Sequence, residues 1–137
     1  TLAEVEDMMQ KKGGLKGISR NTADVRDLRE DELAGDERSE LAFEMFVYRI
    51  QRFIGSYTAV LGGLEVLIFT GGVGERAYYI RRRICEKFAY VNLKLDNKKN
   101  RANETTISSA DSEVTVMVVP TNEELEIARE SFSVLED

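Results

Sequence analysis

The longest hydrophobic pattern along the chain has the period of an α-helix. Over Glu37–Leu61, apolar side chains recur at intervals of three and four residues, the spacing that lines one face of a helix. The members of this face are Phe43, Phe46, Val47, Ile50, Ile54, Tyr57 and Leu61. Tyr48 and Phe53 widen the apolar surface, so we expect a helix that is covered on both sides, with its aromatic rings in the core. Gly62 and Gly63 end the pattern.

Shorter patterns have the period of β-strands. Val66–Phe69 and Val114–Val119 are apolar runs of strand length, which predict buried strands. Tyr90–Leu95 alternates apolar and polar residues and predicts a half-exposed strand, and Thr105–Ser108 predicts another.

Three more helices are expected on either side of these strands. Leu2–Lys12 runs into two glycines that are typical of a helix end, and Glu75–Phe88 follows the first apolar strand. The last helix opens with a capping box in which Thr121 pairs with Glu124. Two polar stretches predict loops: Leu15–Ala23 and Asp96–Asn103.

This order of elements predicts an α/β fold with the two apolar strands adjacent in one sheet. A chain of 137 residues is expected to form a single domain. Ligands in such sheets gather at the carboxyl ends of the strands. The segments after Phe69 and Val119 both lie at such ends, so we expect them to face the same crevice.

The segment after the first apolar strand, Thr70–Arg76, is rich in glycine. Glycine permits positive φ and holds no Cβ against a ligand, and a helix N-terminus favours an anion. The amides of Gly72, Val73 and Gly74 are therefore candidates for bracketing a phosphate. The alternative is a tight turn that needs glycine only for its geometry. Glu75 is a site candidate or an acid favoured by the helix dipole alone.

Two other stretches offer charged groups. In Asp24-Val25-Arg26, a guanidinium can stack on a purine and a carboxylate can accept from ribose hydroxyls, although a solvated loop explains the same residues. Glu123 follows a strand end, and a carboxylate there can reach Mg²⁺ through water. Acids in the first turn of a helix are also common for capping reasons.

Composition excludes several kinds of chemistry. A net charge of −6 argues against nucleic acid and against an anionic membrane surface as partners. The chain has no histidine and only one cysteine, Cys85, for which we expect a buried structural role. Arg81-Arg82-Arg83 is expected to form the solvated face of a helix. No signal peptide or membrane-spanning run is recognised, which leads us to expect a cytoplasmic location.

Taken together, the motifs resemble a known family. Asn21–Asp27, Phe69–Glu75 and Val119–Leu125, with Phe46–Ile50 and Leu61–Leu64 between them, look like the C-terminal part of an acetate kinase, in the same order and at similar spacing. The resemblance covers nearly the whole chain. It implies the nucleotide-side domain of an actin-like, sugar-kinase/Hsp70-type fold, with a mixed sheet and flanking helices.

The resemblance also implies roles for the candidate residues. Asp24, Val25 and Arg26 would line the adenosine pocket, and Glu123 would help to hold Mg²⁺. A second nucleotide-binding loop would be formed by Gly72, Val73, Gly74, Glu75 and Arg76. The family usually has asparagine at the position of Arg76, so the nucleotide contact of this residue is in doubt.

The family transfers the γ-phosphoryl group of ATP reversibly to acetate, giving acetyl phosphate and ADP. Its acyl pocket, catalytic residues and first phosphate loop lie upstream of Thr1, so we expect no catalytic residue and no kinase activity in this chain alone. A propionate or butyrate kinase, a non-catalytic nucleotide-binding module and a pseudo-enzyme remnant are the alternatives. The resemblance further implies a homodimer.

Overall fold

The computed structural model describes residues 1–136 and divides into two compact units, Thr1–Val60 and Leu61 onward. Each unit is described by itself. The expectation that the chain acts as a single domain stays a prediction.

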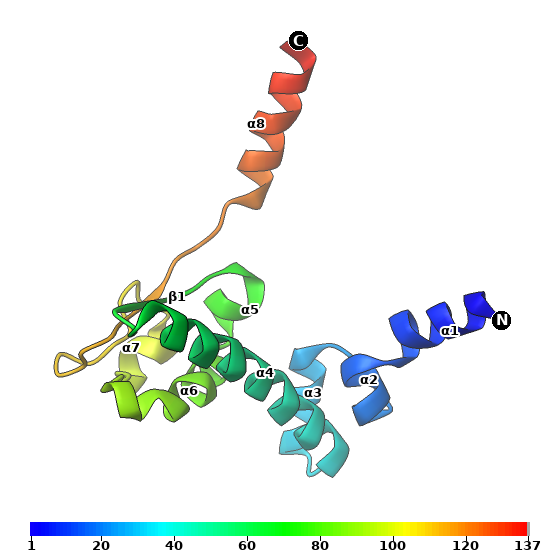
Figure 1. The fold of residues 1–137 in the computed structure, drawn as a ribbon, viewed down its shortest axis with the longest axis horizontal. Coiled ribbons are helices and arrows are strands. Elements are labelled where there is room, and N and C mark those ends of the chain that lie inside the picture. Colours follow the sequence, from blue (N-terminus) through cyan, green and yellow to red (C-terminus); the bar gives the residue numbers. More distant parts are fainter. Residues whose placement is uncertain (137) are drawn as a thin grey trace. The chain divides into compact units, whose positions relative to one another are not determined.

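The first unit is entirely helical (Figure 1). Its elements are α1 (Leu2–Asp7), η1 (Met8–Lys12, a π-helix), α2 (Gly14–Ser19), α3 (Val25–Leu33) and α4 (Glu37–Leu61). The first helical segment and α4 were predicted from the pattern, and α4 has the predicted bounds. The prediction of a loop over Leu15–Ala23 was wrong for its first half, which forms α2. Gly14 and Gly17 lower the helix propensity of that stretch, so the sequence pattern does not predict this helix.

The core of the first unit lies around the first half of α4. Leu28 from α3 and Ala42, Phe43 and Val47 from α4 are almost completely buried. The expectation that the aromatic rings of α4 are all in the core was wrong. Three of its rings are more than half exposed: Tyr48 (61%), Phe53 (55%) and Tyr57 (62%).

The second unit combines helices with a small sheet. Its elements are β1 (Val66–Phe69), α5 (Gly71–Arg76), α6 (Tyr78–Cys85), η2 (Glu86–Val91, a 3₁₀ helix), α7 (Asn97–Ala102), β2 (Thr115–Val118) and α8 (Glu123–Glu136). The helix predicted over Glu75–Phe88 is broken at Ala77, whose φ and ψ of −95° and 73° are not helical.

Two predictions for the second unit were wrong. The strand expected over Tyr90–Leu95 is the end of η2 and an irregular segment, because Asn92 adopts a left-handed conformation that ends the pattern. The loop expected over Asp96–Asn103 contains α7, which begins where the carboxylate of Asp96 accepts from the amides of Lys98 and Lys99.

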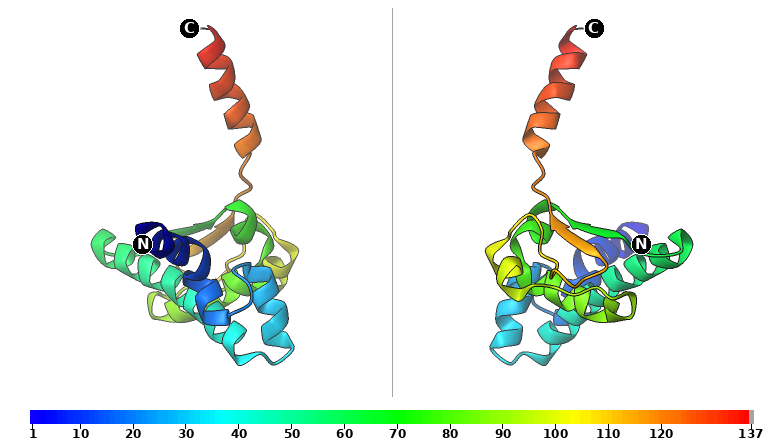
Figure 2. Two further views of the ribbon diagram at one scale, coloured as in Figure 1. Left: turned by 90° about the vertical axis from the view of Figure 1, so that its right-hand side faces the viewer. Right: turned by 90° about the vertical axis from the view of Figure 1, so that its left-hand side faces the viewer.

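The sheet confirms that the two apolar strands are neighbours. β1 and β2 run parallel, with Val66 opposite Thr115 and Phe69 opposite Val118 (Figure 2). Among the described residues, antiparallel pairing is limited to the isolated bridges Leu95–Ser108 and Thr106–Met117, so the expected Thr105–Ser108 strand is not formed. The α/β class is confirmed, and the regular sheet is small and parallel.

The core of the second unit packs α6 against the sheet and the segments that flank it. Its most buried side chains are Ile80, Ile84, Phe88, Leu93, Ile107, Val114 and Val116. Throughout the described part of the chain, every helix is too short or too polar to cross a bilayer.

Candidate functional site

The glycine-rich turn that leads from β1 into α5 and forms the start of that helix contains three glycines with different local requirements. Gly71 has a φ of +71°, which side chains rarely adopt. A Cβ on Gly74 would lie 3.2 Å from the carbonyl carbon of Phe69, so the close packing of α5 on β1 favours a glycine there. A Cβ on Gly72 would meet no atom within 4 Å. The fold therefore explains Gly71 and Gly74 but does not explain Gly72.

The helix that follows this turn is short. α5 has six residues, which is less than two turns, so its dipole is weaker than that of the long helix predicted from the sequence. The amides of Gly72 and Val73 lie in its first turn, where N–H groups have no intrahelical acceptor. Val73 and Arg76 are exposed, and Arg76 is the last residue of the helix.

Glu75 joins the two segments that leave the carboxyl ends of the strands. Its Oε1 accepts hydrogen bonds from the amide of Gly71 (3.0 Å), the amide of Thr121 (2.9 Å) and the hydroxyl of Thr121 (3.1 Å). These bonds, led by the one from the Thr121 amide, lower the pKa of the Glu75 carboxyl. The two segments are thus joined at the carboxyl ends of the strands, and the expectation that they face the same crevice stays a prediction. Glu75 uses its carboxylate to hold the protein backbone.

The start of α8 differs from the predicted capping box. The side chain of Asn122 accepts from the amide of Leu125 (3.1 Å), so Asn122 is the N-cap. Thr121 is engaged with Glu75 instead of Glu124, which makes the capping-box prediction wrong. Glu123 is the first residue of α8 and is exposed. No group of three or more acidic, histidine or cysteine side chains suited to a metal is found in residues 1–136.

Asp24 and Arg26 in the first unit form a compact pair. Asp24 is the N-cap of α3, and its Oδ1 accepts from the backbone amide (2.8 Å) and the Nε (3.0 Å) of Arg26. A second bond joins the Arg26 guanidinium to Oδ2, and the side-chain bonds from Arg26 lower the pKa of Asp24 to about 2. The guanidinium is held in one orientation while 79% of the Arg26 side chain stays exposed. Val25 is half-buried beside it.

The loop before α3 supports this pair. The hydroxyl of Thr22 accepts from the amide of Asp24 (3.0 Å) and donates to the carboxylate of Asp27 (2.9 Å). Ser19, which is 5% exposed, donates to the carbonyl of Thr22 (2.8 Å). Asp24–Arg26 and Gly72–Arg76 belong to different units, so the implied binding of one nucleotide by both segments stays a prediction.

Sequence reasoning missed the most buried charged residue. Arg81 was expected on a solvated helix face, but it is completely buried and bonds to backbone carbonyls of α5. A signal was present: Ala77, Ile80, Ile84 and Phe88 recur at helical spacing, and position 81 falls on the face that they define. Arg81 was predicted to be exposed because it is charged, although its position in the sequence places it on the buried face of the helix.

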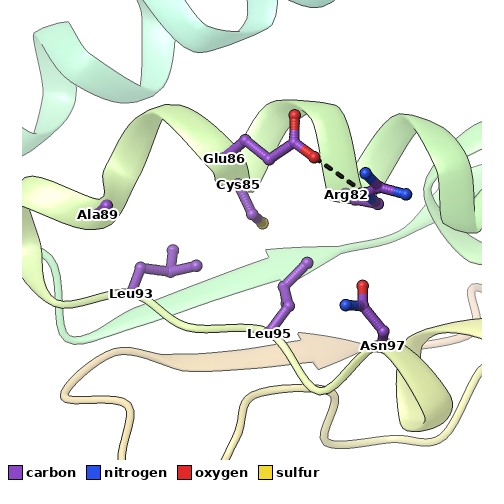
Figure 3. A pocket seen from close by; sticks show the side chains of 7 residues that line it. All are labelled: Arg82, Cys85, Glu86, Ala89, Leu93, Leu95 and Asn97. Atoms are coloured by element: carbon purple, nitrogen blue, oxygen red, sulfur yellow. Dashed lines mark hydrogen bonds and ion pairs between the residues drawn. The ribbon is translucent and has the colours of Figure 1, made fainter.

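A cavity of about 280 Å³ lies between α6 and the segment over residues 93–97 (Figure 3). Cys85, Leu93 and Leu95 point into it, and Arg82 pairs with Glu86 along the helix (2.9 Å). Cys85 is buried, as expected, and burial raises the pKa of its thiol to about 12, which disfavours the reactive thiolate. None of the predicted site residues lines this cavity.

Comparison with known proteins identifies the family behind this geometry. The profile of the acetokinase family matches residues 1–129. The chain belongs to the acetokinase family. An acetate kinase from Heliobacterium modesticaldum is 43% identical over 136 residues, which are 98% of this chain and 34% of that protein. The chain therefore spans about a third of the length of the curated relatives it matches.

Solved structures of the acetokinase family share the fold. The crystal structure of Porphyromonas gingivalis acetate kinase has a TM-score of 0.82 and 38% identity, and the match covers 98% of this chain and 35% of that one. A propionate kinase from Francisella tularensis has a TM-score of 0.84 and 39% identity, over 95% of this chain and 33% of that one. These matches confirm the fold predicted from the resemblance.

Proposed function

We propose that this chain is the nucleotide-binding part of an acetate kinase, which transfers the γ-phosphoryl group of ATP reversibly to acetate. Acetyl phosphate and ADP are the products. The match to acetate kinases over nearly the whole chain supports this proposal. The observation that carries it is Gly72, a glycine that the fold does not require, in a turn between a strand and a short helix. A ligand that approaches the backbone closely would explain a glycine at this position, because a Cβ would stand in its way.

The candidate residues then divide between two parts of the nucleotide. Asp24, Val25 and Arg26 would hold the adenosine, with the fixed guanidinium of Arg26 available for stacking on the base. Gly72, Val73 and Gly74 would present their backbone to the phosphate side. Glu75 would keep this turn in place through Thr121, and Arg76 would lie at the end of α5.

Mg²⁺ would be held in part by Glu123. Its carboxylate is exposed and is not the N-cap of α8, which suits a cation that takes few protein ligands and keeps several waters. When bound, the ion would neutralise charge on the phosphates. The chain supplies no group that we assign to the chemical step, so it is expected to be inactive alone. Its affinity for nucleotide is expected to be weak. The family resemblance further leads us to expect that it acts in a longer, dimeric enzyme in the cytoplasm.

A propionate kinase is the second candidate, supported by the similarity to the Francisella tularensis propionate kinase. The two candidates differ in the acyl acceptor. None of the residues assigned above contacts that acceptor in our proposal, so both make the same predictions for nucleotide binding by this chain. A butyrate kinase and a non-catalytic nucleotide-binding module also agree with those predictions.

Titration of Mg–ADP into the chain, followed by NMR or calorimetry, tests the proposal. We expect weak binding at millimolar nucleotide that is lost in Gly72→Val and reduced in Asp24→Ala. Gly63→Val is a matched control, because a Cβ on Gly63 also meets no atom within 4 Å but lies outside the turn. No binding by the unsubstituted chain, or equal loss in Gly63→Val, would contradict the proposal. Production of acetyl phosphate by the purified chain would contradict the expected inactivity.

A further inference from the structure

Arg81 is the only completely buried cation among the described residues, and its guanidinium is fully bonded. Nε donates to Oδ1 of Asn100 (2.8 Å), one terminal nitrogen donates to the carbonyls of Gly74 (2.7 Å) and Glu75 (2.9 Å), and the other donates to the carbonyl of Asn100 (2.7 Å) and Oδ1 of Asn103 (2.6 Å). These bonds match the five N–H donors of an arginine side chain. No lysine can reproduce this planar arrangement.

The carbonyls that Arg81 takes from α5 need an external donor. The break at Ala77 ends α5, and the last carbonyls of a helix have no intrahelical partner. The amide of Ala77 bonds to the carbonyl of Val73 (3.0 Å), and Arg81 bonds to the two carbonyls that follow. A cation at this end also suits the helix dipole. Arg81 therefore caps the C-terminal end of the glycine-rich helix.

The other side of the guanidinium is tied to α7. Asn100 is 1% exposed, and its side-chain amide donates to the carbonyl of Tyr78 (2.9 Å), so its Oδ1 is fixed toward Arg81. Asn103 ends α7 in a left-handed conformation with a φ of 53°. Arg81 thus connects the end of α5 to Asn100 and Asn103, which lie 19 and 22 positions after Arg81 itself.

We infer that Arg81 is a positioning residue for the nucleotide-binding turn: through Gly74 and Glu75 it sets the direction in which the amides of Gly72–Gly74 point. The inference rests on the proposed function, because it assigns Arg81 a role in presenting those amides to the phosphates. Glu75 and Thr121 hold α5 near its first residue, and Arg81 holds it near its last. The turn is therefore fixed at both ends.

Three variants separate positioning from general stability. Arg81→Lys keeps the positive charge but replaces the five N–H donors of the planar guanidinium with a single ammonium group. Asn103→Gly removes a single acceptor and suits the left-handed conformation of that residue, so it is expected to fold even where Arg81→Lys does not. Arg82→Lys is the matched control, since Arg82 lies next to Arg81 but its side chain is 57% exposed and pairs only along the helix surface.

Two measurements are made on each variant of the full chain. Amide hydrogen exchange is expected to speed up at Ala77, whose amide is bonded to the carbonyl of Val73 within α5, and to stay unchanged at Val116 in β2. Affinity for Mg–ADP is expected to fall about tenfold in Arg81→Lys and about threefold in Asn103→Gly, by the loss of bonds to a charged group. Affinity for adenosine, which the turn does not hold, is expected to stay the same, and Arg82→Lys is expected to change nothing.

The outcomes separate the inference from the proposed function. Unchanged exchange at Ala77 in Asn103→Gly and Arg81→Lys would overturn the inference, whether or not nucleotide binds. Faster exchange throughout the second unit would also overturn it, because Arg81 would then act on general stability. Failure of the unsubstituted chain to bind Mg–ADP would count against the proposed function, while local exchange would still report whether Arg81 holds the turn.

Discussion

Asp24 and Glu75 are both acids in candidate binding segments, yet they are held in opposite ways. The partner of Asp24 is two residues away, in the side chain and amide of Arg26. The partner of Glu75 across the sheet edge is Thr121, which is 46 residues away. The pKa of each carboxyl is lowered by these bonds. One segment is shaped by its own few residues, and the other takes its shape from distant parts of the second unit.

This difference indicates which substitutions are expected to disturb each segment. The hydrogen bonds described for the Asp24 segment come from its loop, the start of α3 and Ser19 at the end of α2, so substitutions far from these residues are expected to leave it intact. The glycine turn depends on the packing of Gly74 against Phe69, on Thr121 and on Arg81. Substitutions in these distant partners are expected to disturb it even though none of them belongs to the turn.

The largest effect is expected from Gly74→Val. A valine side chain with its Cβ at 3.2 Å from the Phe69 carbonyl carbon pushes α5 away from β1, and overpacking of this kind costs about 1–3 kcal/mol. Urea unfolding followed by circular dichroism measures the loss. A change within error of the unsubstituted chain would show that α5 can move freely from β1 and that the turn is as self-contained as the Asp24 segment.

A smaller loss of stability is expected from Asp24→Ala, which removes the N-cap of α3 and the bond to Arg26. Asp24→Asn keeps an oxygen for the cap and is expected to lose less. Because the pKa of Asp24 is lowered from 3.8 to about 2, its contribution is complete above about pH 4 and is lost as the pH falls toward 2. Unfolding curves between pH 2 and 5 should show this loss for the unsubstituted chain but not for Asp24→Ala. Equal pH dependence in both would contradict the assignment.

Thr121→Val is expected to act on the pKa of Glu75 more than on stability. It removes the hydroxyl bond and keeps the amide bond, so the pKa of Glu75 rises toward its ordinary value of 4.5. The ionised Glu75 stabilises the fold fully above that value, and the contribution is lost as the pH falls through the lowered folded pKa. Carboxyl titration by NMR measures both acids in one sample. A shift at Asp24 as well would show that the two segments are coupled.

The smallest effect on stability is expected from Gly72→Ala. The added Cβ meets no atom within 4 Å, and alanine is a better helix former, so the free energy of unfolding should be unchanged or raised by up to about 1 kcal/mol. Urea unfolding measures it beside Gly74→Val. A clear destabilisation by Gly72→Ala would mean that the fold does require this glycine, and the observation that carries the proposed function would be lost.

The elements that the sequence predicts well are those with long or strongly apolar patterns. α4, β1 and β2 were found near their predicted bounds because periodic burial decides their type. α2 and α7 were missed because their residues are glycine-rich or lysine-rich and carry little hydrophobic pattern. Asp96 and Asn103, at the two ends of α7, were the available signals: an N-cap carboxylate and a residue able to adopt the left-handed conformation.

The candidate site could be located from sequence but its supports could not. Gly72 and Asp24 stand out through local motifs, whereas the partner of Glu75 is distant in sequence and depends on the parallel pairing of β1 with β2. Arg81 was assigned to solvent because arginine is rarely buried without an acidic partner. Here amide and carbonyl oxygens replace that partner, and residue types alone do not reveal such an arrangement.

Because those oxygens are neutral, the hydrogen bonds at the two ends of α5 differ in how they depend on pH. Protonation of Glu75 weakens the bonds near Gly71, whereas the acceptors of Arg81 have no acidic proton to gain at the same pH. Acidification is therefore expected to weaken the hold on Gly71 while the bonds from Arg81 to the carbonyls of Gly74 and Glu75 persist.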